Sequence, residues 1–131
     1  ELEDMGADSY NPDDDYPDFI IPVAKKVADN PNEHRGIVIG GAGQGEAIAA
    51  NKIKGIRAVA YYGDEPDIVL LSRKHNNTNV LSLGARFLSK KEAIQATEMW
   101  LSTSFEGGRH ERRIKKIGAI LTKPFWKLTG K

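Results

Sequence analysis

Apolar residues along the chain change repeatedly between two spacings, one typical of buried strands and one typical of helices. Short apolar runs bounded by glycine or polar turn residues predict strands at 36–39, 56–62 and 80–84. Apolar residues three and four positions apart predict helices at 19–28, 46–54, 66–74, 90–101 and 109–121. Strands that alternate with helices indicate an α/β fold, with a mainly parallel sheet covered on both faces.

Polar residues add detail at the ends of these elements. Ser89, followed three positions later by Glu92, predicts a capping box at the start of one helix. Residues 75–79 read as a polar turn between a helix and a strand, and residues 9–18 as a turn-rich loop. Leu2 and Met5 lie in a short stretch, residues 2–6, that reads as the end of a strand.

Composition narrows the class of protein. A chain of 131 residues is long enough to bury one core, so residues 1–131 are expected to form a single domain. No apolar run approaches the roughly 18 residues that a membrane span needs, and the acidic N-terminus is unlike a signal peptide. The absence of cysteine excludes disulfides and thiolate chemistry, and makes a reducing cytoplasm the default location.

Acidic and basic residues are concentrated at opposite ends of the chain. A net charge of +1 gives no overall attraction to nucleic acid. The first eighteen residues carry only acidic charges, whereas residues from Arg109 onward are rich in arginine and lysine. This polarity predicts either an acidic arm that meets a basic tail, within a chain or between subunits, or two solvated surfaces.

The glycine-rich stretch from Gly40 to Glu46 follows a predicted strand and opens a predicted helix. Such glycines allow a sharp turn and direct backbone N–H groups toward one point, which suits an anion or a developing oxyanion. A tight turn without a ligand is the alternative. A dinucleotide fingerprint requires Gly or Ala where Glu46 stands, and a Walker loop requires Gly-Lys-Ser/Thr, so neither nucleotide motif is present.

Several polar side chains are candidates for chemistry. Glu46 either stabilises its helix through the dipole or acts as a general base beside the oxyanion site. His75, near Asn76 and Asn79, either caps a helix or moves a proton to a sugar ring oxygen. Arg109 and Arg113 are four residues apart and share a helix face, and His110 lies between them in the sequence. The two arginines either bind phosphate together with Arg86 or form a solvated surface. The histidine spacing does not predict a metal site.

Three segments carry a family resemblance when they are taken together in their order. GIVIGGAGQGEAIAANKIKGIRA, SRKHNNTNVLSLGAR and FEGGRHERRIKKI closely resemble the type B ribose-5-phosphate isomerase family, which includes the galactose-6-phosphate isomerase subunits, and DDDYPDF fits as well. The resemblance implies a Rossmann-like three-layer sandwich and a homodimer or homotetramer with shared sites. It also implies cofactor-free and metal-free aldose–ketose isomerisation of a phosphorylated sugar, most simply ribose 5-phosphate to ribulose 5-phosphate, through an enediol.

The resemblance also assigns roles to residues of this chain. Glu46 matches a catalytic base and His75 a histidine implicated in ring opening. The expected substrate-binding residues are Gly41, Ala42, Gly43, Gly45, Asn76, Tyr16, Arg86, Arg109, His110 and Arg113. Among these, the loop amides and Asn76 would stabilise the enediolate, and the arginines would contact phosphate, some of them across the dimer.

The chain departs from the family pattern in three respects. Many members have a cysteine base where Gly40 stands, whereas a second branch has glycine there and a glutamate where Glu46 stands. Ala42 replaces the usual Ser or Thr. Nothing in the sequence matches the family's first strand with its Asp-His pair, so we expect the chain to lack the first βα unit, either through truncation or because another segment supplies it. These departures leave a non-catalytic sugar-phosphate-binding or structural subunit as the alternative function.

Overall fold

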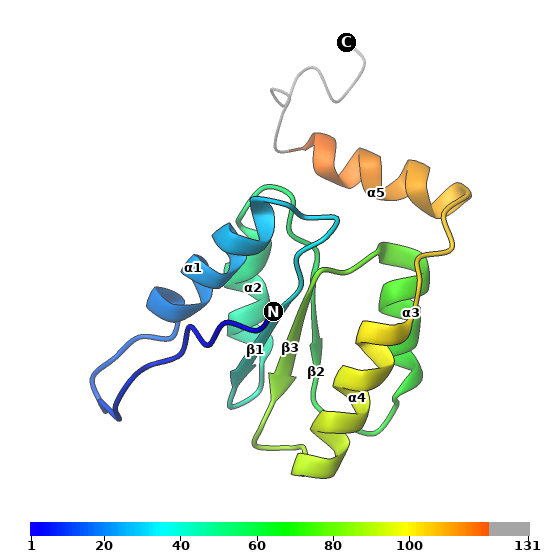
Figure 1. Cartoon of the computed structure of the whole chain (residues 1–131). Helices are drawn as coiled ribbons and strands as arrows, with labels where there is room; N and C mark the ends of the chain where they lie inside the picture. The colour runs from blue at the N-terminus through cyan, green and yellow to red at the C-terminus, as the bar shows by residue number, and fades with distance from the viewer. Residues whose placement is uncertain (121–131) are drawn as a thin grey trace.

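The computed structural model describes residues 1–120, and its centre is a sheet of three parallel strands (Figure 1). The strands are β1 (Gly36–Gly40), β2 (Ala58–Tyr61) and β3 (Val80–Gly84). Their order is β1-β3-β2, and Val80 pairs with Gly36 on one side and with Ala58 on the other. The parallel sheet predicted from the sequence is confirmed.

The described part of the chain contains five helices. They are α1 (Pro17–Ala28), α2 (Gln44–Asn51), α3 (Asp67–Asn76), α4 (Lys90–Ser102) and α5 (Arg109–Ala119). All five predicted helices are therefore present. The last one was predicted to reach Leu121, which lies outside the described residues.

Side chains that alternate along the strands bury two apolar layers, one on each face of the sheet. Val80 packs with Ala24 of α1 and Ala50 of α2 on one face. The next residue, Leu81, packs with Val69 of α3 and Trp100 of α4 on the other face. Because successive side chains of a strand point to opposite faces, a sheet covered by helices on both sides is the result. This arrangement is the predicted three-layer sandwich.

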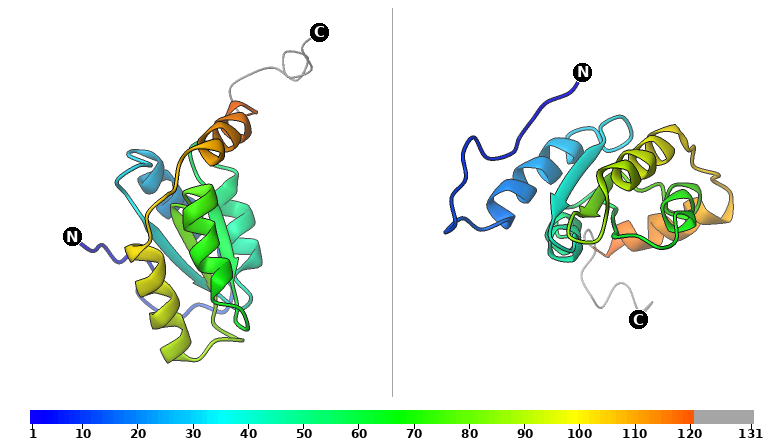
Figure 2. Two further views of the ribbon diagram at one scale, coloured as in Figure 1. Left: turned by 90° about the vertical axis from the view of Figure 1, so that its right-hand side faces the viewer. Right: turned by 90° about the horizontal axis from the view of Figure 1, so that it is seen from below.

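The N-terminal arm differs from the prediction. Residues 2–6 form no strand, and the arm runs along the outer side of α1 (Figure 2), where Glu3 pairs with Lys26 at 2.9 Å. The strand β1 forms one edge of the sheet, and its side chains Ile37 and Ile39 are 38% and 64% exposed. The interpretation of residues 2–6 as a strand was wrong, because the segment lies against α1 and not beside the open edge of β1.

Three predicted boundaries also shift. The helix predicted at 46–54 is α2, which begins two residues earlier, in the glycine loop itself. The strand predicted at 56–62 shortens to β2. The predicted polar turn begins later than expected, because His75 and Asn76 form the last turn of α3, which ends where Asn77 adopts a left-handed conformation with φ of 45°. No helix in residues 1–120 is both long and apolar enough to cross a membrane.

The predicted capping box at the start of α4 is formed in full. The Ser89 hydroxyl accepts a hydrogen bond from the Glu92 amide at 3.1 Å, and the Glu92 carboxylate accepts one from the Ser89 amide at 3.0 Å. These bonds from Ser89 hold the pKa of Glu92 below its usual value. The carboxylate bond of the cap therefore stabilises the fold near neutral pH and is lost as the pH falls through the lowered pKa of Glu92, whereas the bond to the Ser89 hydroxyl does not titrate.

Replacing Ser89 by Ala is expected to lower the free energy of unfolding by about 1 kcal/mol, because the first turn of α4 loses its side-chain acceptor. Urea unfolding followed by far-UV circular dichroism measures the change. Ser104→Ala is the control, since Ser104 lies in an exposed loop with no side-chain hydrogen bond to residues 1–120. Equal stability of Ser89→Ala and wild type would show that the cap contributes nothing.

Candidate active site

The glycine loop lies between β1 and α2 at the carboxyl edge of the sheet. Gly43 is the residue before α2 and has a φ of 76°, a left-handed conformation that a side chain would strain. Its carbonyl accepts a hydrogen bond from the Ser82 hydroxyl at 2.6 Å. The amides of Ala85 and Arg86 donate to the carbonyls of Gly40 and Gly41 at 2.8 and 3.0 Å. The end of β3 therefore fixes the shape of the loop.

Ser82 was missed from the sequence as a residue of this site. It is fully buried in the middle of β3, between Leu81 and Leu83. A polar residue inside an apolar strand needs a hydrogen-bond partner, and this requirement was the available signal. Ser82 meets it by donating a hydrogen bond to the Gly43 carbonyl.

Glu46 is the third residue of α2, and its side chain turns back over the start of the loop. Only 6% of the residue is exposed. A Cβ atom placed on Gly40 would overlap the Glu46 carboxylate, so this carboxylate occupies the space that a side chain at position 40 would take. Within residues 1–120 the carboxylate forms no hydrogen bond or ion pair. It is therefore a buried carboxylate at the loop with its oxygens available for a ligand.

Gly40→Ala tests whether the Glu46 carboxylate needs the space above Gly40. The added methyl group would displace the far end of the Glu46 side chain while leaving the backbone contacts in place. We expect a melting temperature close to that of wild type, and a loss of about one to two orders of magnitude in any reaction that uses this carboxylate, because the carboxylate is misplaced. Thermal unfolding measures the first quantity and steady-state kinetics measures the second. Gly118→Ala, on exposed α5 with free space around the position, is the control for a Gly-to-Ala change.

Two further predicted residues lie against the same loop. The Tyr16 hydroxyl lies directly over Gly45, and the Arg86 guanidinium lies over Gly41, with Nη2 3.0 Å from the position of a Cβ atom there. Beside the loop is a cavity of about 420 Å³, lined by Ala42, Gln44, Tyr62, Asp64 and Phe87. The structure thus brings Glu46, the loop, Tyr16, Arg86 and Asp64 to one edge of the sheet. Gln44, Tyr62 and Phe87 were not identified from the sequence.

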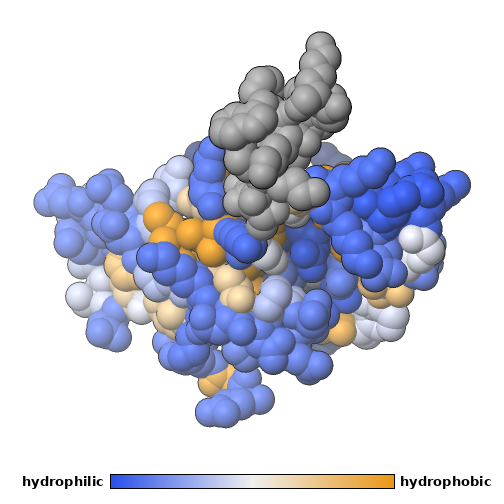
Figure 3. All heavy atoms as spheres, turned by 90° about the horizontal axis from the view of Figure 1, so that it is seen from above, coloured by the Kyte–Doolittle hydropathy of each residue, from blue (hydrophilic) through white to orange (hydrophobic). Residues whose placement is uncertain are grey.

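The remaining predicted residues lie at the opposite, amino edge. The arrow of β3 points away from α5, so His75 at the end of α3 and His110 in α5 lie where the strands begin (Figure 1). Viewed from this end, the surface is mainly hydrophilic around a smaller apolar patch (Figure 3). Asn76, Arg109 and Arg113 are exposed at the same edge.

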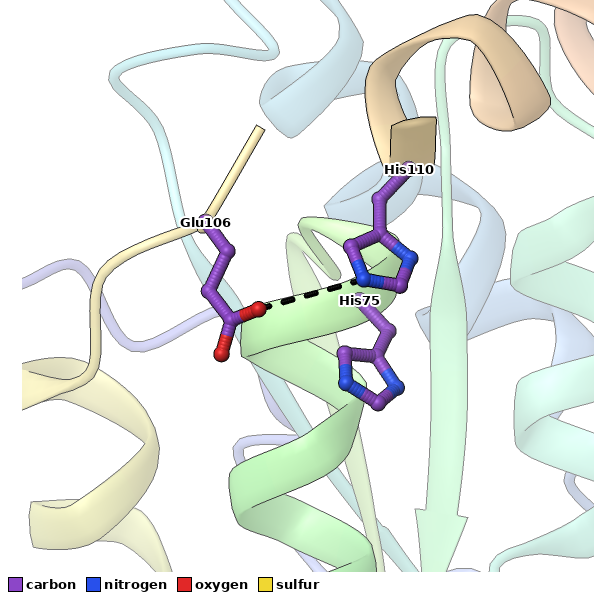
Figure 4. A group of neighbouring side chains, drawn as sticks. All are labelled: His75, Glu106 and His110. Atoms are coloured by element: carbon purple, nitrogen blue, oxygen red, sulfur yellow. Dashed lines mark ion pairs between the residues drawn. The ribbon is translucent and has the colours of Figure 1, made fainter. Parts of the chain in front are cut away.

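His75 and His110 stack on one another, and Glu106 approaches them from the preceding loop (Figure 4). Their ring centroids are 4.2 Å apart with 12° between the planes. The Glu106 Oε2 atom lies 3.8 Å from His110 Nε2. Burial lowers the pKa of His110, and the nearby His75 and Arg109 lower it further, whereas Glu106 opposes the shift. The buried imidazole of His110 is therefore held toward its neutral form.

The predicted residues thus form two groups within one chain. A five-residue strand spans roughly 16 Å, and the groups lie at its two ends. The loop with Glu46 offers a base and oxyanion donors, whereas the histidines with Arg109 and Arg113 offer proton transfer and positive charge. One chain does not bring the two groups to a common ligand.

Comparison with known proteins gives the family. The ribose/galactose isomerase family model matches residues 1–117. The chain is 44% identical over 114 residues to the probable ribose-5-phosphate isomerase B of Mycoplasma genitalium, covering 87% of this chain and 74% of that protein. It is 45% identical over 106 residues to ribose-5-phosphate isomerase B of Escherichia coli, covering 81% and 69% of the two chains.

Solved structures agree with this assignment. Ribose-5-phosphate isomerase B from Mycoplasma genitalium, crystallised with bound ribulose 5-phosphate, superimposes with a TM-score of 0.87 at 41% identity, over 92% of this chain and 78% of that one. The enzyme from Clostridium thermocellum gives a TM-score of 0.85 at 42% identity, over 93% and 80%. The chain therefore belongs to the ribose/galactose isomerase family and is an isomerase.

Proposed function

We propose that this protein interconverts ribose 5-phosphate and ribulose 5-phosphate, with Glu46 as the base. The observation that carries the proposal is the position of the Glu46 carboxylate, buried over Gly40 at the start of a loop rich in backbone donors. The names of the relatives support the choice of a pentose phosphate. The bound ribulose 5-phosphate in the Mycoplasma genitalium structure supports the same choice.

In the proposed reaction, Glu46 removes the proton from C2 of the open-chain aldose and delivers it to C1. The electrons of the broken C–H bond form the C1–C2 double bond of an enediolate, and the former carbonyl oxygen O1 takes the negative charge. Amides of residues 41–45 stabilise this charge. The proton of the O2 hydroxyl passes to O1, and a carbonyl forms at C2 as C1 is protonated, so atoms and electrons balance.

We also propose that the residues at the amino edge complete the site of a neighbouring subunit. These residues are His75, His110, Arg109 and Arg113. His75 and the loop lie at opposite ends of one sheet, so a substrate that needs both must lie between two chains. Helix α5 supports such an assembly, because Ile117 on the helix and Ile120 directly after it are more than half exposed. We infer a homodimer, or a homotetramer built from it. In it, the partner subunit's His75 assists ring opening, and arginines such as Arg109 and Arg113 bind the phosphate.

Incubation of the protein with ribose 5-phosphate and detection of ribulose 5-phosphate tests the proposed activity. The expected result is conversion to an equilibrium mixture that the protein reaches from either sugar. The alternative is a sugar-phosphate-binding subunit without activity, which the substitution of Ala42 for a hydroxyl residue would favour. Binding of ribose 5-phosphate by calorimetry with no conversion would establish that alternative.

A further inference from the structure

His75, Glu106 and His110 bring three metal-binding atoms together, although they are far from adjacent in the sequence. One imidazole nitrogen of each histidine and one carboxylate oxygen of Glu106 all lie within 4.8 Å of one another. The histidines come from α3 and α5, and Glu106 from the loop between α4 and α5. The Glu106 amide donates a hydrogen bond to the Lys74 carbonyl at 3.1 Å, so the loop is fixed beside the end of α3.

The ligand atoms of this group are free to bind an ion. Neither imidazole forms a hydrogen bond with residues 1–120, and the Glu106 carboxylate makes only the 3.8 Å contact with His110. Two imidazoles and one carboxylate form a donor set typical of Zn²⁺ sites that keep a fourth position open.

We propose that His75, Glu106 and His110 form a site for a divalent transition-metal ion of the Zn²⁺ class. Ligands at Zn²⁺ bond lengths in a tetrahedral site are about 3.3 Å apart, so the atoms must close by up to about 1.5 Å. The two stacked rings must also turn so that their in-plane lone pairs meet at one point. The half-exposed Glu106 side chain can supply part of this movement. Arg109 and Arg113 lie near His110 and oppose the ion, so we expect a moderate affinity and a readily removed metal.

The site would regulate the proposed activity. If His75 handles a proton of the sugar, which rests on the function proposed above, a metal ion on its ring nitrogen takes the same lone pair. A bound ion would also hold His110 away from the substrate. Zn²⁺ is then an inhibitor that competes with ribose 5-phosphate and is removed by a chelator.

Titration of the full chain with Zn²⁺ alone, followed by calorimetry, tests the site without any measurement of activity. We expect one ion per chain with micromolar affinity, and with Co²⁺ the visible absorption that tetrahedral coordination produces. Glu106→Gln should weaken binding at least about tenfold, and His110→Gln should abolish it. His34→Gln is the matched control, because His34 is exposed and its Nδ1 contacts the Lys26 carbonyl far from the group.

Two outcomes would overturn the site: no binding at submillimolar Zn²⁺, or binding that is unchanged in both Glu106→Gln and His110→Gln. Glu106 is exposed, so its substitution is not expected to unfold the chain, and circular dichroism checks this. Inhibition is measured separately with ribose 5-phosphate. Specific Zn²⁺ binding without inhibition would overturn the proposed competition between Zn²⁺ and ribose 5-phosphate. A protein that binds Zn²⁺ but has no isomerase activity would contradict the proposed function and leave the metal site intact.

Discussion

Glu46→Gln is expected to lower kcat for ribose 5-phosphate by about 10²- to 10⁴-fold, the usual contribution of a general base. The amide has nearly the same shape as the carboxylate and keeps the position over Gly40, but it cannot accept the proton from C2. The buried site should tolerate the change, because the carboxylate has no ion-pair partner within residues 1–120. KM should therefore change much less than kcat.

Glu98→Gln provides the control, since Glu98 lies exposed on α4, away from the loop. Exchange of the C2 proton of the substrate with solvent gives a second measurement, and the variant should lose this exchange together with turnover. An unchanged kcat in Glu46→Gln would exclude Glu46 as the base. A large rise in KM with kcat intact would instead assign it to substrate binding.

The fold could be predicted well because its signals are local. Strands such as β3 are short, apolar and bounded by turn residues, and the capping box at Ser89 fixes the start of α4. The error at residues 2–6 has a physical cause. A strand exists only through bonds to a neighbour, and two apolar residues in a short segment do not reveal whether a neighbour is present.

The two groups of site residues differ in how far sequence could predict them. The loop from Gly40 to Glu46 is contiguous, so its backbone donors and its carboxylate could be identified from one short stretch of sequence. The approach of His75 to His110 joins residues 35 positions apart, and depends on how α5 packs against the end of α3. Whether His75 lies over the glycine loop was open from the sequence. A helix that follows a parallel strand runs back to the amino edge, so α3 carries its last turn away from Glu46.

The separation of Glu46 and His75 leads to the second large expected effect, a recovery of activity on mixing. Glu46→Gln and His75→Ala should each be nearly inactive alone. When the two variants are unfolded and refolded together, half of the dimers contain one chain of each kind. Each mixed dimer has one intact site and one doubly defective site, so activity should return to about a quarter of wild type.

A chain carrying both substitutions is the matched control. Mixed with an equal amount of wild type, it places one defect in each site of every mixed dimer, so only wild-type dimers remain active, again at about a quarter. Sites contained within single chains would give a different pair of results: no recovery with the single variants, and about half of wild-type activity with the double variant. Because α3 and the glycine loop end at opposite edges of the same sheet, we expect the first pair of results.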